Sequence, residues 1–278
     1  MPRKIIFVGH CSLDIVLDGM HPVAAEASSL MLDAARRLAL AGLDVHFTGE
    51  AAADRAGDFI VDSLAKAGVD TSLIDRPTEC ATTLRLIDQN RPGECQSVYT
   101  RTSRERVSFG WPSASPSDIV VFGGYFALDT RTCADVAEFI ATAAERGMIV
   151  VGIPGYEPQL EPAITHVMPT LLDGLDRTDI VFAADGDLGH IWRSRQPLTP
   201  EECFRRNISF YADAMVNVDS ATGVVTQCDR QQCTRMQAQP SRTLAGAALA
   251  GLLAAIARDP RPDRQTILTQ LPSWQPIL

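Results

Sequence analysis

The chain has 278 residues, a formal net charge of −9 and a hydrophobic fraction of 46%, which indicates a folded protein with a sizeable core and excludes a disordered chain. Lys4 and Lys66 are its only lysines, so we expect neither a nucleic-acid-binding surface nor a Walker A phosphate loop. The longest apolar stretch, 244–257, is shorter than the roughly 20 residues that cross a bilayer, so no membrane partner is expected.

The seven cysteines are scattered along the chain, and no signal-like segment precedes them. This usage is typical of reduced thiols in a cytoplasmic protein. Only Cys228 and Cys233 lie close together, and their spacing without a neighbouring histidine pair does not suit zinc.

Short apolar runs without alternation predict strands that are covered on both faces. They lie at 4–9, 45–48, 118–122, 148–153, 179–183 and 214–218. Helical patterns lie between them, at 30–41, 56–67, 133–146 and from 200 toward 210. Asp54 is a good N-cap for the second helix and Gly68 a good stop. Strands that alternate with helices of this length predict an α/β fold with a mostly parallel central sheet and helices on both faces.

One section departs from this alternation. Residues 81–88 and 94–101 are rich in Thr, Ile, Val and Tyr and flank a turn that contains Pro and Gly, which predicts a β-hairpin. A hairpin inside an α/β chain usually stands off the main sheet. The chain is therefore expected to be a single domain, 1–278, with a small β lid formed by about 12–30 and 78–107.

Several motifs occur in an order that resembles the PfkB carbohydrate kinase family, the ribokinase-like enzymes. Gly49, Asp54 and Gly57 precede a helix that is followed by A-G-V-D-T at 67–71. A first strand leads to Asp14. The other matching pieces are 36–42, Gly123-Gly124-Tyr125, 197–202 and 247–256.

The resemblance implies a ribokinase-like fold with a β lid over a sugar site, an arrangement that agrees with the fold predicted from the periodicity. It also implies transfer of the γ-phosphate of ATP, with magnesium, to a hydroxyl of a small polyhydroxy metabolite such as a sugar or nucleoside. A homodimer formed through the lid would be consistent with the resemblance.

The family signature near the carboxyl terminus, D-T-x-G-A-G-D, opens a helix whose turn presents N–H groups to phosphate and whose last aspartate takes the substrate proton. Here that stretch is 240–246, and the catalytic aspartate position holds Gly246. The implied anion-binding residues are Arg242, Thr243, Leu244, Ala245 and Gly246. The residues alone also allow Ser241 to cap a buried helix with Arg242 in solvent.

On the substrate side, the family's Gly-Gly and Asn positions fall at Ser28, Ser29 and Asp33, and its sugar-binding aspartate falls at Asp14. The resemblance therefore implies Asp14, Ser29 and Asp33 as substrate-binding residues. Asp33 accepts hydrogen bonds but lacks the amide donors of asparagine. Asp14 is also compatible with a loop aspartate that binds nearby N–H groups.

On the nucleotide side, the family's N-x-x-E falls at 184–187, where Asp187 keeps a carboxylate that could contact magnesium. Asp185 and Asp187 could equally belong to an acidic loop before a helix. Asp219 adds a negative charge where the family's backbone approaches the nucleotide. Pro240 replaces the family's monovalent-cation aspartate.

Three functions are compatible with this pattern. The first is a kinase homologue that binds a small polyhydroxy ligand and has weak or no phosphotransfer, because Gly246 cannot accept a proton. The second is an active ATP-dependent carbohydrate kinase with a relocated base, at Asp14, Asp33 or Asp187. The third is a structural role in which the lid mediates dimerisation.

Overall fold

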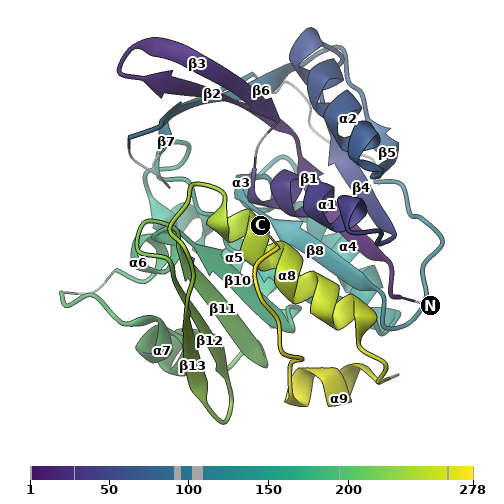
Figure 1. Cartoon of the computed structure of the whole chain (residues 1–278), viewed down its shortest axis with the longest axis vertical. Helices are drawn as coiled ribbons and strands as arrows, with labels where there is room; N and C mark the ends of the chain where they lie inside the picture. The colour runs from purple at the N-terminus through teal and green to yellow at the C-terminus, as the bar shows by residue number, and fades with distance from the viewer. Residues whose placement is uncertain are drawn as a thin grey trace.

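The protein contains two β-sheets that stand apart from each other (Figure 1). The computed structural model describes residues 2–27, 29–90, 95–101, 109–193, 195–261 and 263–277; for 95–101 it describes the backbone. The larger sheet has nine strands and the smaller one four.

The nine-stranded central sheet has the strand order β13-β12-β11-β10-β9-β8-β1-β4-β5. Its strands are β1 (Ile5–His10), β4 (Val45–Glu50), β5 (Asp70–Asp75), β8 (Ile119–Gly123), β9 (Ile149–Ile153), β10 (Ile180–Ala184), β11 (Ala214–Asp219), β12 (Val224–Asp229) and β13 (Cys233–Gln237). All neighbours from β11 to β5 are parallel, whereas β12 and β13 extend the sheet antiparallel. The predicted mostly parallel sheet is confirmed, and the carboxyl ends of the parallel strands meet at one edge.

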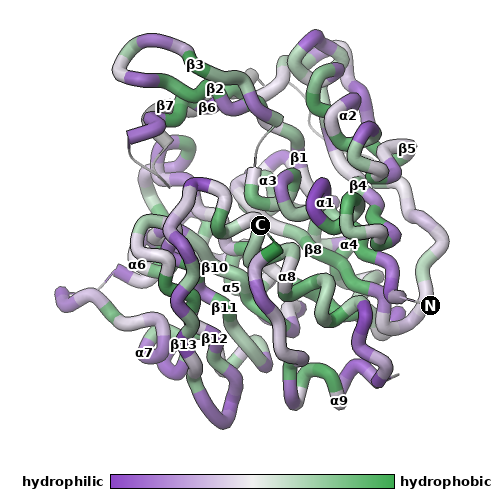
Figure 2. The backbone as a smooth tube through the Cα atoms, viewed as in Figure 1, coloured by the Kyte–Doolittle hydropathy of each residue, from purple (hydrophilic) through white to green (hydrophobic). Residues whose placement is uncertain are grey.

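Helices cover both faces of the central sheet, as expected. They are α1 (Leu30–Leu40), α2 (Arg55–Ala67), α3 (Tyr125–Leu128), α4 (Cys133–Glu145), α5 (Ile164–Asp176), α6 (Asp187–Ile191), α7 (Pro200–Cys203), the π-helix η1 (Phe204–Ile208), α8 (Leu244–Arg258) and α9 (Arg264–Thr269). Alternate residues of β1 explain the two layers. Ile5 and Phe7 join the core with α1 and α8, whereas Ile6 and Val8 join the core with α3 and α4. Figure 2 shows α8 as mostly hydrophobic along its length, which fits its burial.

The four-stranded sheet, which we call the lid sheet, has the order β3-β2-β6-β7. It contains β2 (Ser12–Asp18), β3 (His21–Ala27), β6 (Ala81–Asp88) and β7 (Cys95–Arg101). Two hairpins far apart in sequence therefore lie side by side, joined by parallel pairing of β2 with β6. These strands fall within the two segments expected to form a lid, of which Ser28, 91–94 and 102–108 lie outside the described residues.

The cap predictions for α2 are confirmed. The Asp54 side chain accepts from the Gly57 N–H, and Gly68 closes the helix with φ of 95°. No helix within the described ranges is long and apolar enough to span a bilayer.

The expectation that all cysteines are reduced is wrong for one pair. Cys228 of β12 and Cys233 of β13 form a disulfide. The antiparallel pairing sets these two residues directly opposite each other, which brings their Cα atoms to 4.1 Å. Cys11, Cys80, Cys133 and Cys203 remain thiols.

Candidate functional site

A cleft of about 1000 Å³ lies between the lid sheet and the carboxyl-end edge of the central sheet. The lid sheet contributes Asp14, Glu26 and Arg85, and the edge of the central sheet contributes His10 and Gly123. The beginnings of α1 and α8 complete the wall. In an open α/β sheet this edge is the usual place for a ligand, so the cleft is the candidate site.

Nearly all of the residues expected to act on ligand or phosphate meet in this cleft. Its lining includes Asp14, Ser29, Asp33, Asp187, Arg242, Thr243, Ala245 and Gly246. Leu244 is the exception, because its side chain is fully buried in the core. Ser28 lies outside the described residues.

Asp14 lies in the middle of strand β2, so the alternative of a loop aspartate is wrong. Its side chain is buried, with 4% of its surface exposed. Strand pairing sets it opposite Glu26 of β3 on one side and Arg85 of β6 on the other. The lid sheet thus presents a row of three ionisable side chains, all of which line the cleft.

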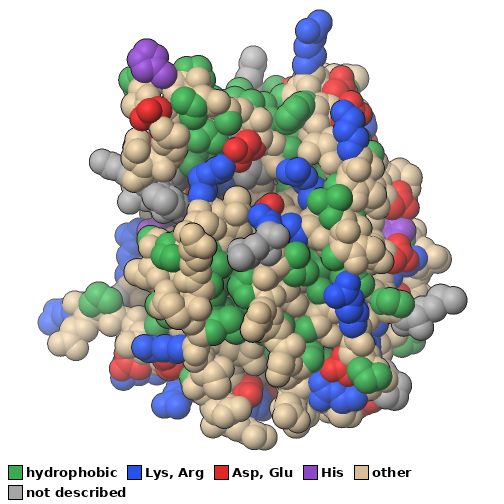
Figure 3. Space-filling model, viewed as in Figure 1, with side chains coloured by type: hydrophobic (Ala, Val, Ile, Leu, Met, Phe, Trp, Pro, Cys, Tyr) green, Lys and Arg blue, Asp and Glu red, His purple; other side chains and the backbone are tan. Residues whose placement is uncertain are grey.

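Two ion pairs join the lid sheet to the rest of the protein across the cleft. The Arg242 guanidinium donates to both carboxylate oxygens of Glu26, at 2.9 and 2.7 Å. Arg85 lies 3.5 Å from Glu157, in the loop that follows β9. Figure 3 shows basic and acidic side chains side by side where the lid sheet overlies the start of α8. The interpretation that places Arg242 in solvent is therefore wrong.

The N-terminus of α8 opens into the cleft. Its N-cap is Thr243 and not Ser241, and the Thr243 side chain makes no capping bond. The Leu244 N–H donates to the Ser241 carbonyl. The regular helical hydrogen bonds begin with the Ala247 N–H, which donates to the Thr243 carbonyl. The first turn of a helix carries unpaired donors and partial positive charge. This end of α8 is therefore suited to hold an anion.

Asp33 of α1 and Gly246 of α8 lie in direct contact. A Cβ atom built on Gly246 would lie 2.2 Å from Oδ2 of Asp33 and 2.9 Å from its Cβ and Cγ. The same Oδ2 accepts from Nε of Arg37, one turn along α1, at 2.9 Å. The Asp33 carboxylate therefore fills the space that a side chain at position 246 would enter.

The acidic residues after β10 are engaged with backbone and hydroxyl groups. Asp187, the first residue of α6, accepts from the Ala184 N–H at 3.2 Å. Asp185 accepts from the N–H and hydroxyl of Ser220. Asp219 accepts from the N–H groups of the turn that follows it. Among the described residues, no three His, Cys, Asp or Glu side chains are grouped to hold a metal ion, although Asp185 and Glu157 line the cleft together with Asp187.

Burial raises the pKa of Asp187 to about 7, and the negative charges of Glu157 and Asp185 add to this effect. Because this value lies above the 3.8 of the unfolded chain, ionisation of Asp187 costs stability as the pH rises from about 4 to about 7. We expect Asp187→Asn to be more stable than the unaltered protein at pH 8, by about 2 kcal/mol, and to lose that advantage near pH 4. Urea unfolding at pH 4, 6 and 8 measures the difference, and a difference independent of pH would contradict the assignment.

Two further residues of the cleft wall, Glu26 and Glu157, belong to no motif that could be recognised in the sequence. His10, which the sequence places at the end of the first strand near the expected ligand face, also lines the cleft. Burial, followed by the charge of Arg85, lowers the pKa of His10 to about 4. Its ring packs 5.6 Å from that of Phe126. His10 is therefore a neutral imidazole at neutral pH, able to donate one hydrogen bond and accept another.

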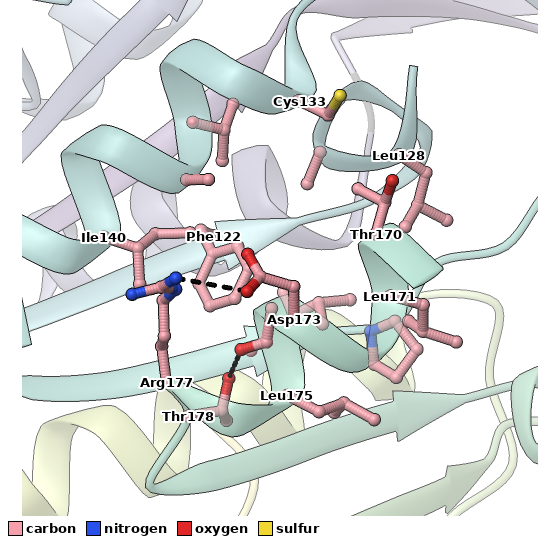
Figure 4. Close-up of a pocket in the computed structure, with 17 residues that line it drawn as sticks. Phe122, Leu128, Cys133, Ile140, Thr170, Leu171, Asp173, Leu175, Arg177 and Thr178 are labelled. Carbon is pink, nitrogen blue, oxygen red and sulfur yellow. Dashed lines mark hydrogen bonds and ion pairs between the residues drawn. The ribbon is translucent and has the colours of Figure 1, made fainter. Parts of the chain in front are cut away.

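A second cavity, of about 30 Å³, lies between α4 and α5 (Figure 4). The Asp173–Arg177 ion pair and the hydrogen bond from Thr178 to the Gly174 carbonyl lie on its wall. It has room for about one or two water molecules and is a packing gap rather than a ligand site.

Residues 34–243 match the family model described as pfkB family carbohydrate kinase. The chain belongs to the PfkB family. The matched segment ends one residue before α8 begins, so Gly246 lies beyond it. A comparison with curated proteins finds no match to this chain.

Solved structures of PfkB-type kinases share the fold. A fructokinase from Vibrio cholerae O395, bound to fructose, ADP and calcium, has a TM-score of 0.79 at 16% identity, covering 96% of this chain and 88% of its own. A Xylella fastidiosa fructokinase with bound ATP has a TM-score of 0.70 at 21% identity, with coverage of 96% and 86%. The aminoimidazole riboside kinase of Salmonella enterica, complexed with aminoimidazole riboside and an ATP analogue, has a TM-score of 0.75 at 13% identity, with coverage of 96% and 88%.

Proposed function

We propose that this PfkB-family protein binds a small polyhydroxy metabolite in the cleft, and that phosphate transfer from ATP to it is weak unless another group replaces the base missing at Gly246. One observation carries the proposal. The buried carboxylate of Asp14 and the open N-terminus of α8 line the same cavity, so a group that accepts hydrogen bonds from hydroxyls and a group suited to phosphate face one ligand space.

The substrate side of the cleft supports a polyhydroxy ligand. Asp14 and Asp33 offer carboxylate oxygens to hydroxyl donors, and Ser29 adds a hydroxyl at the cleft. The Vibrio cholerae fructokinase holds fructose and the Salmonella enterica kinase holds aminoimidazole riboside, and both compounds are polyhydroxy. These acceptors favour a neutral polyol or nucleoside over a ligand that carries its own carboxylate.

The start of α8 supports a role in binding the phosphates of ATP. Thr243, Ala245 and Gly246 line the cleft at the positive end of a 15-residue helix. Magnesium bound to a nucleotide draws most of its ligands from phosphate and water. Asp187 is the residue on this wall that would hold such an ion.

The third possibility, a homodimer formed through the lid, has separate support. β3 is an edge strand of the lid sheet, and Val23 on it and Met20 beside it expose 54% and 85% of their surface. Exposed apolar side chains on an edge strand are typical of a pairing surface. This role is compatible with ligand binding and is tested by the molecular mass in solution.

Thermal unfolding tests the proposed binding. We expect a polyol or nucleoside at about 100 times its Kd to stabilise the protein by roughly 2.7 kcal/mol, a rise in Tm of about 5 °C for a chain of this size. Magnesium–ATP is expected to give a separate rise. Asp14→Asn should abolish the polyol shift and leave the nucleotide shift, whereas Asp62→Asn on the exposed side of α2 serves as the matched control. If neither ligand class raises Tm, the proposed function is wrong.

A further inference from the structure

We propose that Asp33 is the catalytic base of this protein, supplied from α1 in place of the carboxylate that position 246 lacks. The inference rests on the proposed function, because a base acts only on a bound acceptor. The sequence is compatible with a relocated base at Asp14, Asp33 or Asp187, and the structure favours Asp33.

The contact between Asp33 and Gly246 is the first support. A carboxylate on a side chain at 246 would begin from a Cβ that lies 2.2 Å from the present position of Asp33 Oδ2. The Asp33 carboxylate therefore lies directly beside position 246, although it is carried by another helix. Glycine at 246 is also the residue that leaves room for it.

The surroundings of Asp33 hold the carboxylate in one orientation. It lies in the first turn of α1, where its N–H donates to the Ser29 carbonyl. Arg37 binds Oδ2 at 2.9 Å and is itself tied to the Ile277 carbonyl at 2.8 Å. Oδ1 has no protein partner among the described residues, and 22% of the side chain is exposed where it lines the cleft. Arg37 thus fixes Oδ2, and Asp33 as a whole lines the cleft.

The other two candidates are less suitable. Asp187 lies at the start of α6, and its carboxylate is turned toward the Ala184 N–H. Asp14 belongs to the lid sheet, in a row between Glu26 and Arg85. Of the three carboxylates, Asp33 is the one in contact with the helix terminus that would hold the phosphate.

With Asp33 as the base, the transfer of the γ-phosphate proceeds as follows. Asp33 Oδ1 accepts the proton of an acceptor hydroxyl as that oxygen forms a bond to the γ-phosphorus of ATP. The bond between the γ-phosphorus and the β,γ-bridging oxygen breaks, and ADP leaves from the positive end of α8. The proton on Asp33 then passes to water, giving a phosphate monoester, ADP and a released proton.

The experiment exchanges the two side chains. ADP release is measured for the unaltered protein, Asp33→Asn, Asp33→Gly with Gly246→Asp, and the Asp62→Asn control. Glycine at position 33 frees the space that a Cβ at position 246 would enter. The acceptor is the polyol that gives the largest thermal shift, and a second arm uses water alone. Asp33→Asn is expected to lose about 100-fold or more in kcat while its thermal shift with the acceptor stays within a few-fold in apparent Kd. The double variant is expected to regain at least 10-fold over Asp33→Asn.

Each other result overturns the assignment. Turnover unchanged in Asp33→Asn would show that Asp33 is not the base. Loss of acceptor binding together with turnover would show that Asp33 acts in binding alone and not as the base. A double variant that turns over when the unaltered protein does not would show that the carboxylate acts only from position 246. A protein that binds the acceptor but releases no ADP in any variant would leave the binding proposal standing and remove the base, whereas absence of all binding would remove the proposed function itself.

Discussion

Replacing Asp54 with alanine is expected to lower the free energy of unfolding by about 3 kcal/mol. One carboxylate oxygen of Asp54 caps α2 by accepting from the Gly57 N–H at 2.8 Å and also accepts from the Thr82 hydroxyl at 2.6 Å. The other oxygen accepts from the Thr82 N–H at 2.8 Å. A lost cap costs about 1 kcal/mol, and hydrogen bonds to a charged group contribute about 1.5 to 3 kcal/mol. Asp54 therefore joins α2 to the lid strand β6, and its loss loosens both.

The effect of this substitution depends on pH in a defined direction. Burial opposes ionisation of Asp54, but the hydrogen bonds from Thr82 and Gly57 outweigh it and lower the pKa of the carboxyl. Because the folded-state pKa lies below that of the unfolded chain, this stabilisation is present above about pH 4 and is lost as the pH falls further. Urea unfolding of Asp54→Ala should therefore converge on that of the unaltered protein in acid.

Asp58→Ala is the matched control for Asp54→Ala. Asp58 lies on the same helix, but its side chain is 65% exposed and pairs with Arg76 at the surface. An exposed pair of this kind contributes about 0 to 1 kcal/mol. Equal losses in the two variants would show that the contacts to Thr82 do not stabilise the fold.

Replacing Arg264 with alanine is expected to lower the free energy of unfolding by about 3 kcal/mol. This loss is independent of that in Asp54→Ala. Arg264, the first residue of α9, binds both carboxylate oxygens of Asp179. The Asp179 side chain is 7% exposed and also accepts from the Val150 N–H at 2.8 Å. Burial raises the pKa of Asp179, and removal of the arginine leaves this buried charge without its cation.

The loss in Arg264→Ala should be larger at pH 8 than at pH 5, because protonation relieves the unpaired carboxylate. Addition of Asp179→Asn to the same variant should recover part of the loss, since the amide needs no cation. Thermal and urea unfolding measure both. A double variant as unstable as Arg264→Ala alone would contradict an electrostatic origin of the effect.

The central sheet could be predicted because its strands carry their signal locally. Runs such as those of β8 and β10 are apolar throughout, as burial on both faces requires. The sequence analysis missed β12 and α5 for the opposite reason. β12 mixes polar residues among its valines, and α5 contains Pro169 within the helix. Both are stabilised by tertiary packing that overrides their local pattern.

The candidate site could be predicted as a set of positions but not as a set of contacts. Asp14, Asp33 and Gly246 are found from motif order along the chain. The contact of Asp33 with Gly246 and the pairing of Glu26 with Arg242 join residues more than 200 positions apart. The periodicity of the sequence cannot predict these contacts, because they form only when α1, α8 and the lid sheet are packed together.

The ion pairs between the lid sheet and the rest of the protein make entry to the cleft depend on charge. Both bonds to Glu26 come from Nη2 of Arg242, so an anion that binds this nitrogen competes with Glu26 for it. Dissolved ions screen both attractions over about 8 to 10 Å at ordinary ionic strength. Salt therefore weakens both the Glu26–Arg242 ion pair and the attraction of Arg242 for an anionic ligand. Because both are weakened together, Glu26 and the ligand compete for this guanidinium at low and at high salt alike.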